Sequence, residues 1–352
     1  MRTTALLLAC FAACSPLTEG DLFVTRPEEV ASTTDAGTPC TPRREQASWP
    51  VRVVFVVQNS GAMCIVDPPG SQPGGSFCQM YAVGLPNPGG TMPARVSVIS
   101  RFFTANAARP NVSAAIVTYG SNPKVIGFQP TNQPPPSELN NFQAQLAQAS
   151  NLQGGLEAAK SLIEQDVQAT AASVRARSRY VVVVLGTGIP FPRCSANDGL
   201  AQYASASQPQ LVWADSAGAS WFCNAVTPGD PDGIDGFTAG SDLNQNAQLF
   251  SAVDGMLRLD MQYGLGDVRV FTRLLMNDAN VAACGPICQD LFGPRPLSET
   301  RAMGTWLLGQ LAQRGQGTFV DPGTPQQLTL SDIDTSEFTT FCGQVPAASG
   351  EP

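Results

Sequence analysis

Two continuous valine-rich runs constrain the fold of this chain more than any other feature. Residues 51–57 read VRVVFVV and residues 179–185 read RYVVVVL, without alternation of apolar and polar side chains. Such runs are typical of strands buried on both faces, as in parallel sheets covered by helices. The first run breaks into the small polar turn Gln58-Asn59-Ser60-Gly61. This turn places polar groups at the carboxyl end of a strand, where open α/β sheets bind their ligands.

The remaining segments alternate between strand and helix patterns. Further strands are predicted at 112–119, 124–128, 268–275 and 317–320. Helices are predicted at 93–107, 137–149 with Ser137 as N-cap, 156–168, 243–263 and 296–313. We therefore expect an α/β fold, a doubly wound and mostly parallel sheet with helices on both faces.

The composition excludes several classes of function. The chain contains no histidine, which removes Ser-His-Asp and Cys-His catalysis, histidine-ligated zinc and imidazole proton transfer. The net charge of −8 argues against a nucleic-acid partner, and no run of Lys or Arg is present that would dock on anionic lipid. We expect a protein that is not an enzyme, requires no cofactor and has no evident small-molecule substrate.

The first residues, MRTTALLLACFAACSP, have the pattern of a secretory signal peptide. Its apolar stretch is too short to anchor the chain across a bilayer. The sequence FAAC at 11–14 resembles a bacterial lipobox, in which Cys14 is acylated; a competing lipobox at Cys10 and an ordinary signal peptide are the alternatives. Ser15 after the cysteine favours the outer membrane, in either leaflet. We expect a leader at 1–14, a tether at 15–48, a domain at 49–344 and a disordered tail at 345–352.

The cysteine count fits an exported protein. Of ten cysteines, Cys10 would leave with the leader and Cys14 would carry lipid, so eight remain. An even set in an exported chain indicates disulfides, although eight cysteines allow 105 connectivities. Proximity suggests Cys64 with Cys78, Cys194 with Cys223, Cys284 with Cys288 and, by elimination, Cys40 with Cys342. A four-cysteine zinc or iron–sulfur site is the alternative, but only one cysteine pair has short spacing.

Four segments resemble, in the same order, the motifs of von Willebrand factor A (vWA) domains. They are VFVVQNSGAM at 54–63, AAIVTYGS at 114–121, NLQGGLEAAKSLI at 151–163 and RYVVVVLGTGIP at 179–190. The resemblance covers residues 49–321 and implies a vWA-like domain of the bacterial lipoprotein form. Domains of this family bind a divalent cation at a metal-ion-dependent adhesion site, which takes its ligands from these motifs.

The resemblance assigns five ligand positions, and this chain keeps one of them. The family places Asp, Ser, Ser, Thr and Asp where this chain has Gln58, Ser60, Ala62, Leu156 and Thr187. Asn59 and Thr187 offer neutral oxygens, whereas Mg²⁺ is usually bound through at least one carboxylate. We therefore predict a degenerate site that holds no metal, at an edge of the sheet that binds a partner.

Two Pro/Gly-rich insertions, at 64–92 and 190–242, each follow a buried strand and leave this same edge. Asp230, Asp232 and Asp235 in the second insertion are a weak calcium candidate. An ordinary turn is the alternative, because an isoleucine stands where a ligand oxygen is needed and no bidentate Glu follows.

The second insertion also carries three large aromatic residues, Trp213, Trp221 and Phe222. They indicate a contact loop, with a small satellite core beneath the loop as the alternative. Our functional hypothesis is a lipid-anchored vWA-like module that binds a protein or envelope partner, as in adhesion. A structural component of an envelope complex and a calcium-assisted adhesin are the alternatives.

Overall fold

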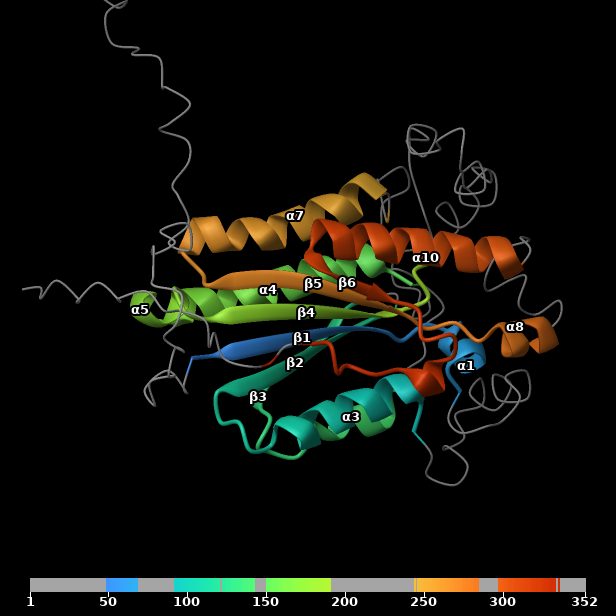
Figure 1. Ribbon diagram of the computed structural model, residues 1–352, viewed down its shortest axis with the longest axis horizontal. Helices are drawn as coiled ribbons and strands as arrows, with labels where there is room; N and C mark the ends of the chain where they lie inside the picture. The colour runs from blue at the N-terminus through green and yellow to red at the C-terminus, as the bar shows by residue number, and fades with distance from the viewer. Residues whose placement is uncertain are drawn as a thin grey trace, which may run out of the picture. The chain divides into compact units, whose positions relative to one another are not determined.

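A computed structural model describes residues 49–68, 92–120, 122–142, 150–190, 244, 246–284, 297–333 and 335. These residues belong to one compact unit, Glu45–Glu337. They form a six-stranded sheet with the order β3-β2-β1-β4-β5-β6 (Figure 1). The strands are β1 Val51–Gln58, β2 Val112–Tyr119, β3 Lys124–Pro130, β4 Arg179–Gly186, β5 Asp267–Leu274 and β6 Gln316–Val320.

The two valine-rich runs lie side by side at the centre of the sheet. Val54 of β1 is opposite Ala115 of β2 on one side and Val182 of β4 on the other. All neighbouring strands run parallel except β3, which pairs antiparallel with β2. The carboxyl ends of β1, β2, β4 and β5 therefore lie at one edge of the sheet, which we call the carboxyl edge.

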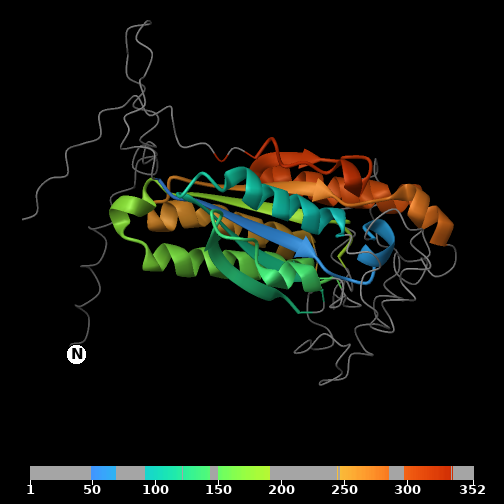
Figure 2. The same ribbon diagram turned by 90° about the horizontal axis from the view of Figure 1, so that it is seen from below.

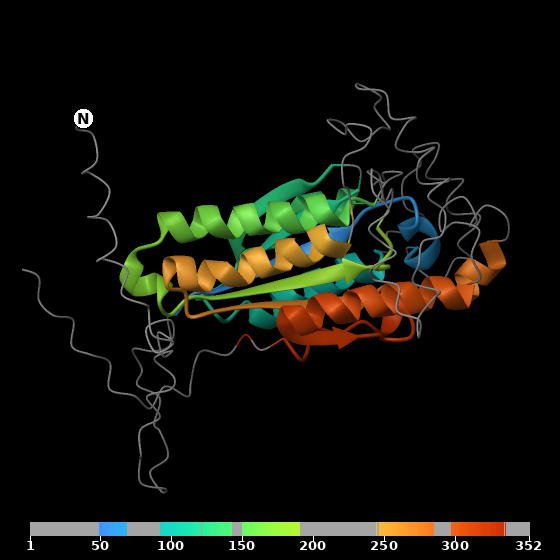
Figure 3. The same ribbon diagram turned by 90° about the horizontal axis from the view of Figure 1, so that it is seen from above.

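Helices cover both faces of the sheet. Helices α4 (Leu152–Ala169), α7 (Asn246–Tyr263) and α10 (Leu297–Arg314) lie side by side on one face (Figure 3). Helix α3 (Ala94–Asn106) covers the opposite face (Figure 2). The short helices α1 (Met63–Val66) and α8 (Asp278–Cys284) lie at the carboxyl edge, and α5 (Ala172–Arg175) at the other end.

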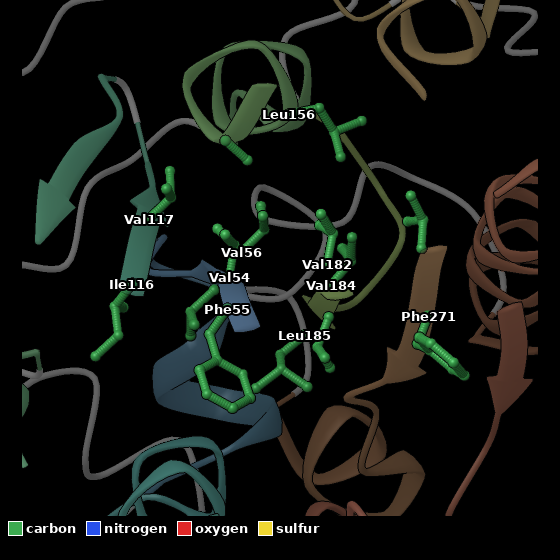
Figure 4. Close-up of a cluster of buried hydrophobic side chains, with 14 of the residues drawn as sticks. Val54, Phe55, Val56, Ile116, Val117, Leu156, Val182, Val184, Leu185 and Phe271 are labelled. Carbon is green, nitrogen blue, oxygen red and sulfur yellow. The ribbon is translucent and has the colours of Figure 1, made fainter. Parts of the chain in front are cut away.

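Side chains of the central strands alternate between these two layers. Val54 and Val56 point toward Leu156 of α4, whereas Phe55 points the opposite way (Figure 4). There the Phe55 ring meets Phe102 of α3 edge to face, with centroids 5.2 Å apart. Burial of each such side chain contributes about 1.5–3 kcal/mol, so the non-alternating sequence is what a sheet between two helical layers requires.

Three helix starts differ from the prediction. Helix α4 begins at Leu152 because the Asn151 side chain accepts a hydrogen bond from the Gly154 amide at 2.9 Å. Ser137 is not an N-cap: residues Ser137–Asn141 form the short 3₁₀ helix η5, and the Ser137 hydroxyl is 3.3 Å from the Glu138 carboxylate. Helix α7 begins at Asn246, since Asn244 has a left-handed backbone with φ 55°.

The first insertion begins later than predicted. Residues Met63–Val66 form helix α1 and are buried, and Cys64 is 4% exposed. Helices α1, α5 and α8 were not predicted, because elements of four to seven residues are too short to show a period. Within the described part of the chain, no helix is long and apolar enough to cross a membrane.

Candidate functional site

The turn after β1, the turn after β4 and the start of α4 meet at the carboxyl edge. The first carries Gln58, Asn59, Ser60 and Ala62, the second Thr187, and α4 carries Leu156. The structure thus brings together the positions that the vWA resemblance assigned to metal ligands. All six side chains are buried, and the most exposed, Ala62, reaches only 8%.

The amide of Gln58 lies at the centre of this cluster. Its Oε1 accepts hydrogen bonds from the Thr187 amide at 2.7 Å and from the Thr187 hydroxyl at 3.0 Å. Its Nε2 donates to the Ser60 hydroxyl oxygen at 2.8 Å. A side-chain amide can both accept and donate hydrogen bonds. Gln58 therefore bonds to the turn after β4 and to its own turn at the same time. A carboxylate in its place would have no proton to offer Ser60.

Tyr119, the last residue of β2, closes one side of the cluster. Its hydroxyl lies 3.5 Å from Gln58 Oε1, and burial raises the pKa of this phenol, which stays protonated. The ring fits because its neighbours are glycines. A Cβ on Gly186 would overlap the Tyr119 hydroxyl, and one on Gly155 would lie 2.9 Å from Tyr119 Cβ.

A buried ion pair supports the turn from the α3 side. Arg95 and Asp67 are both 0% exposed, and Arg95 Nη1 lies 2.9 Å from Asp67 Oδ2. The Asp67 carboxylate also accepts hydrogen bonds from the Ala94 and Arg95 amides, which caps the start of α3. The second Arg95 Nη lies 3.5 Å from Asn59 Oδ1, so the pair connects α3 to the turn after β1. Burial raises the pKa of Asp67, and the neighbouring Arg95 opposes that shift.

Two further contacts fix the rest of the edge. Gly188 has φ +67°, and the backbone of the turn after β4 packs directly against Gly304 of α10, where a side chain would overlap the Thr187 carbonyl. Asn244 and Gln153 exchange two hydrogen bonds, from Gln153 N to Asn244 Oδ1 at 3.0 Å and from Asn244 N to Gln153 Oε1 at 2.8 Å. The chain therefore returns to the start of α4 just before α7.

The residues present do not fit the cation of the family site. Ala62 and Leu156 have no side-chain oxygen, and the Ser60 and Thr187 hydroxyls are both engaged by Gln58. The nearby Asp67 carboxylate is committed to Arg95. Among the described residues, no group of three or more Cys, Asp or Glu is placed to hold a metal ion. Mg²⁺ requires oxygens in nearly octahedral array, which this cluster does not offer.

The other predicted site residues are only partly covered by the structure. Cys64 is in a disulfide, and its predicted partner Cys78 lies outside the described residues. The structure does not describe the side chain of Cys284. The remaining predicted site residues lie outside the described residues: Cys14, Cys40, Cys78, Cys194, Cys223, Cys288, Cys342, Trp213, Trp221, Phe222, Asp230, Asp232 and Asp235.

Sequence reasoning missed Arg95, Asp67 and Asn244. Arg95 lies in the first turn of the predicted helix 93–107, and an arginine there is ordinarily solvent-exposed. The available signal was the spacing of its apolar neighbours: Arg95 lies three and four residues before Val98 and Ile99, on the buried face. Asn244 carried no such signal, because its role depends on a contact with Gln153, 91 residues away.

No protein-family model matches the chain, and no curated protein matches it. Similar solved structures include the PilB minor pilin from Streptococcus sanguinis, with 15% identity and a TM-score of 0.41 over 80% of this chain and 59% of PilB. The vWF domain of the type V pili tip protein Mfa5 from Porphyromonas gingivalis gives 13% identity and a TM-score of 0.34, over 80% and 92% of the two chains. The conserved hypothetical protein BatB from Bacteroides thetaiotaomicron gives 9% identity and a TM-score of 0.33, over 80% and 92% of the two chains.

This chain spans less than two thirds of the length of PilB, and likeness at these scores does not bear on function. The fold assignment follows from the sheet itself. Its order and its parallel centre place the four motif segments at neighbouring positions along one edge. The chain has a vWA-like α/β fold.

Proposed function

We propose that this chain is a lipid-anchored, non-enzymatic binding module of the bacterial cell envelope, which holds a protein or surface partner without a metal ion. The partner docks at the carboxyl edge, where the turns after β1 and β4 meet the start of α4. Acylation at Cys14 attaches the module to the membrane, with the outer membrane as the expected site.

One observation carries the metal-independent part of this proposal. The Gln58 amide joins Ser60 and Thr187 by hydrogen bonds of 2.7–3.0 Å, so the two turns are already held together by protein groups. In a cation-dependent site the ion makes that connection and offers an open position to a partner's carboxylate. Here the connecting group is the Gln58 side chain, which is buried at 1% exposure. A partner would therefore contact the loops around it.

The same contacts argue against catalysis at this edge. A hydroxyl becomes a nucleophile when a neighbouring base takes its proton. The Thr187 hydroxyl donates to the Gln58 carbonyl oxygen, which is no base, and the Ser60 oxygen accepts from the same amide. The chain has no histidine to supply the base.

Manganese titration of the full chain tests this directly, because Mn²⁺ binding is followed by electron paramagnetic resonance without a known partner. We expect no saturable binding at millimolar Mn²⁺. The matched positive control restores the family's ligands in the quadruple variant Q58D/A62S/L156T/T187D. If that variant folds, as judged by circular dichroism, it should gain a bound ion.

Saturable Mn²⁺ binding by the parent that is lost in S60A would contradict the proposal. A second measurement addresses the partner: proteins cross-linked to the module in native envelopes are identified with and without chelator. We expect the same cross-linked proteins in both conditions. Loss of every cross-link on chelation would show that recognition depends on a cation.

A further inference from the structure

The end of the sheet opposite the carboxyl edge has a distinctive charge. We define this amino edge as residues 49–53, 107–114, 170–181 and 264–269, which precede or open β1, β2, β4 and β5. It carries six arginines and a single acidic residue, Asp267. Its net charge is therefore +5, in a chain whose total is −8, so the rest of the sequence carries −13. The six arginines are Arg52, Arg109, Arg175, Arg177, Arg179 and Arg269.

The carboxylates among the described residues pair with only three of these arginines. Arg52 lies 3.2 Å from Asp166, in the last turns of α4. Asp267 is shared between Arg179 at 3.5 Å and Arg269 at 2.8 Å, and the Arg269 side chain remains 47% exposed. Within the described part of the chain, Asp166 and Asp267 are the two carboxylates paired with these arginines.

The other three arginines form no ion pair with a described residue. Arg109 donates to the Thr335 hydroxyl at 2.7 Å. The Arg177 guanidinium lies 4.1 Å from the centre of the Trp49 ring. Arg175 Nε has no hydrogen-bond partner in the described part of the chain. Folding thus brings together arginines that are scattered along the sequence. Because they form no Lys/Arg run, the sequence did not predict this basic edge.

We propose that the amino edge docks on the anionic phospholipid surface of the membrane that carries the lipid anchor. This inference rests on the tether of the proposed function, since residues 15–48 would join the acylated Cys14 to Trp49, at this edge. Arginines near an anionic surface are attracted to its phosphates, and tryptophan is favoured at the boundary between headgroups and water. Docking orients the module, with the carboxyl edge directed away from the bilayer.

The charge at the other end agrees with this orientation. Residues 191–243, which connect β4 to α7 from the carboxyl edge, contain six aspartates and one arginine, Arg193. An anionic surface therefore attracts one end of the domain and repels the segment attached to the other.

The test uses the full chain with C14S, which cannot be acylated, in co-sedimentation with vesicles of phosphatidylcholine alone or with 30% phosphatidylglycerol. We expect binding only to the phosphatidylglycerol vesicles, lost in high salt because exposed charges are screened. The variant R175E/R177E should lower the partition coefficient by about 25-fold or more, since each arginine near such a surface contributes about fivefold.

The control variant K124E/R258E makes the same change in net charge away from the amino edge, on β3 and on the exposed side of α7. It should retain most of the binding, and thermal unfolding of both variants verifies that they fold. Equal binding to both kinds of vesicle, or equal losses in the two variants, would overturn the inference. Mass spectrometry of the N-terminal peptide tests acylation of Cys14 separately, so failure of the anchor and failure of docking are told apart.

Discussion

The two edges of the sheet handle polar groups in opposite ways. At the carboxyl edge, Gln58, Ser60, Thr187, Asp67 and Arg95 are buried and hydrogen-bonded to one another, none more than 1% exposed. At the amino edge the six arginines are half-buried or exposed, and the described carboxylates pair with three of them. The same sheet therefore has one end whose polar groups stabilise the fold and another whose charge is directed at solvent.

This difference between the two edges predicts where a substitution changes stability and where it changes binding alone. An unpaired polar group in the interior costs several times more than a lost contact at the surface. Substitutions at the carboxyl edge should therefore lower the free energy of unfolding strongly, whereas those at the amino edge should barely change it. Substitutions at four positions test this contrast, with urea unfolding of the oxidised protein as the common measurement.

The largest effect is expected from Arg95→Met. The variant leaves the Asp67 carboxylate buried with no cation, and breaking a buried pair in this way costs about 3–5 kcal/mol. The double variant D67N/R95M removes both charges and keeps an oxygen to cap α3, so it should recover part of the loss. Arg301→Met, at an ion pair with exposed partners, is the control and should cost at most about 1 kcal/mol.

The pH dependence of the Arg95→Met variant provides a second readout. Burial already raises the pKa of Asp67 above its ordinary 3.8, and loss of Arg95 removes the opposing effect. Between 3.8 and the raised folded pKa, Asp67 is protonated in the folded state and ionised in the unfolded chain. The free energy of unfolding therefore rises as the pH falls through the folded pKa toward 3.8. Relative to the parent, the variant should gain stability from pH 7 to pH 5. If the two pH profiles run parallel, Asp67 is not a buried carboxylate.

Gly186→Ala should have the next largest effect. The new Cβ would overlap the Tyr119 hydroxyl and approach Gln58 Oε1 to 2.8 Å, and overpacking of this kind costs about 1–3 kcal/mol. Adding Tyr119→Phe removes the obstructing oxygen and should restore part of the stability. Gly309→Ala on α10, where a Cβ meets nothing within 4 Å, should be neutral or stabilising. Equal losses at Gly186 and Gly309 would show that the site is not tightly packed.

The sequence predicted the frame of this edge better than its interactions. The burial of β1 and β4 in a parallel sheet followed from their continuous apolar runs, because a sheet between helical layers leaves no polar face. The meeting of Gln58 with Thr187 followed from the motif order. The direction of the Gln58 amide did not, since it depends on partners 2 and 129 residues away. The amino edge was missed for the same reason, because its arginines come from four separate segments.

A smaller effect is expected at the start of α4. Asn151→Ala removes the oxygen that accepts from the Gly154 amide, and loss of an N-cap costs about 1 kcal/mol. Asn151→Ser keeps a capping oxygen, so its free energy of unfolding should fall by only about a third of the loss in Asn151→Ala. A loss in Asn151→Ser as large as in Asn151→Ala would mean that the contribution comes from other contacts of the side chain rather than from the cap.

The smallest effect on stability is expected at the amino edge itself. Arg177→Gln removes a half-buried guanidinium that lies 4.1 Å from the Trp49 ring centre, and a cation–π contact near the surface contributes about 0.5–1 kcal/mol. Arg258→Gln on α7 is the matched control and should stay within about 0.5 kcal/mol of the parent. The same Arg177 variant should nevertheless weaken binding to phosphatidylglycerol vesicles about fivefold. An arginine that matters more for vesicle binding than for unfolding is what an edge directed at a membrane requires, whereas a loss of 3 kcal/mol would place Arg177 with the buried groups of the opposite edge.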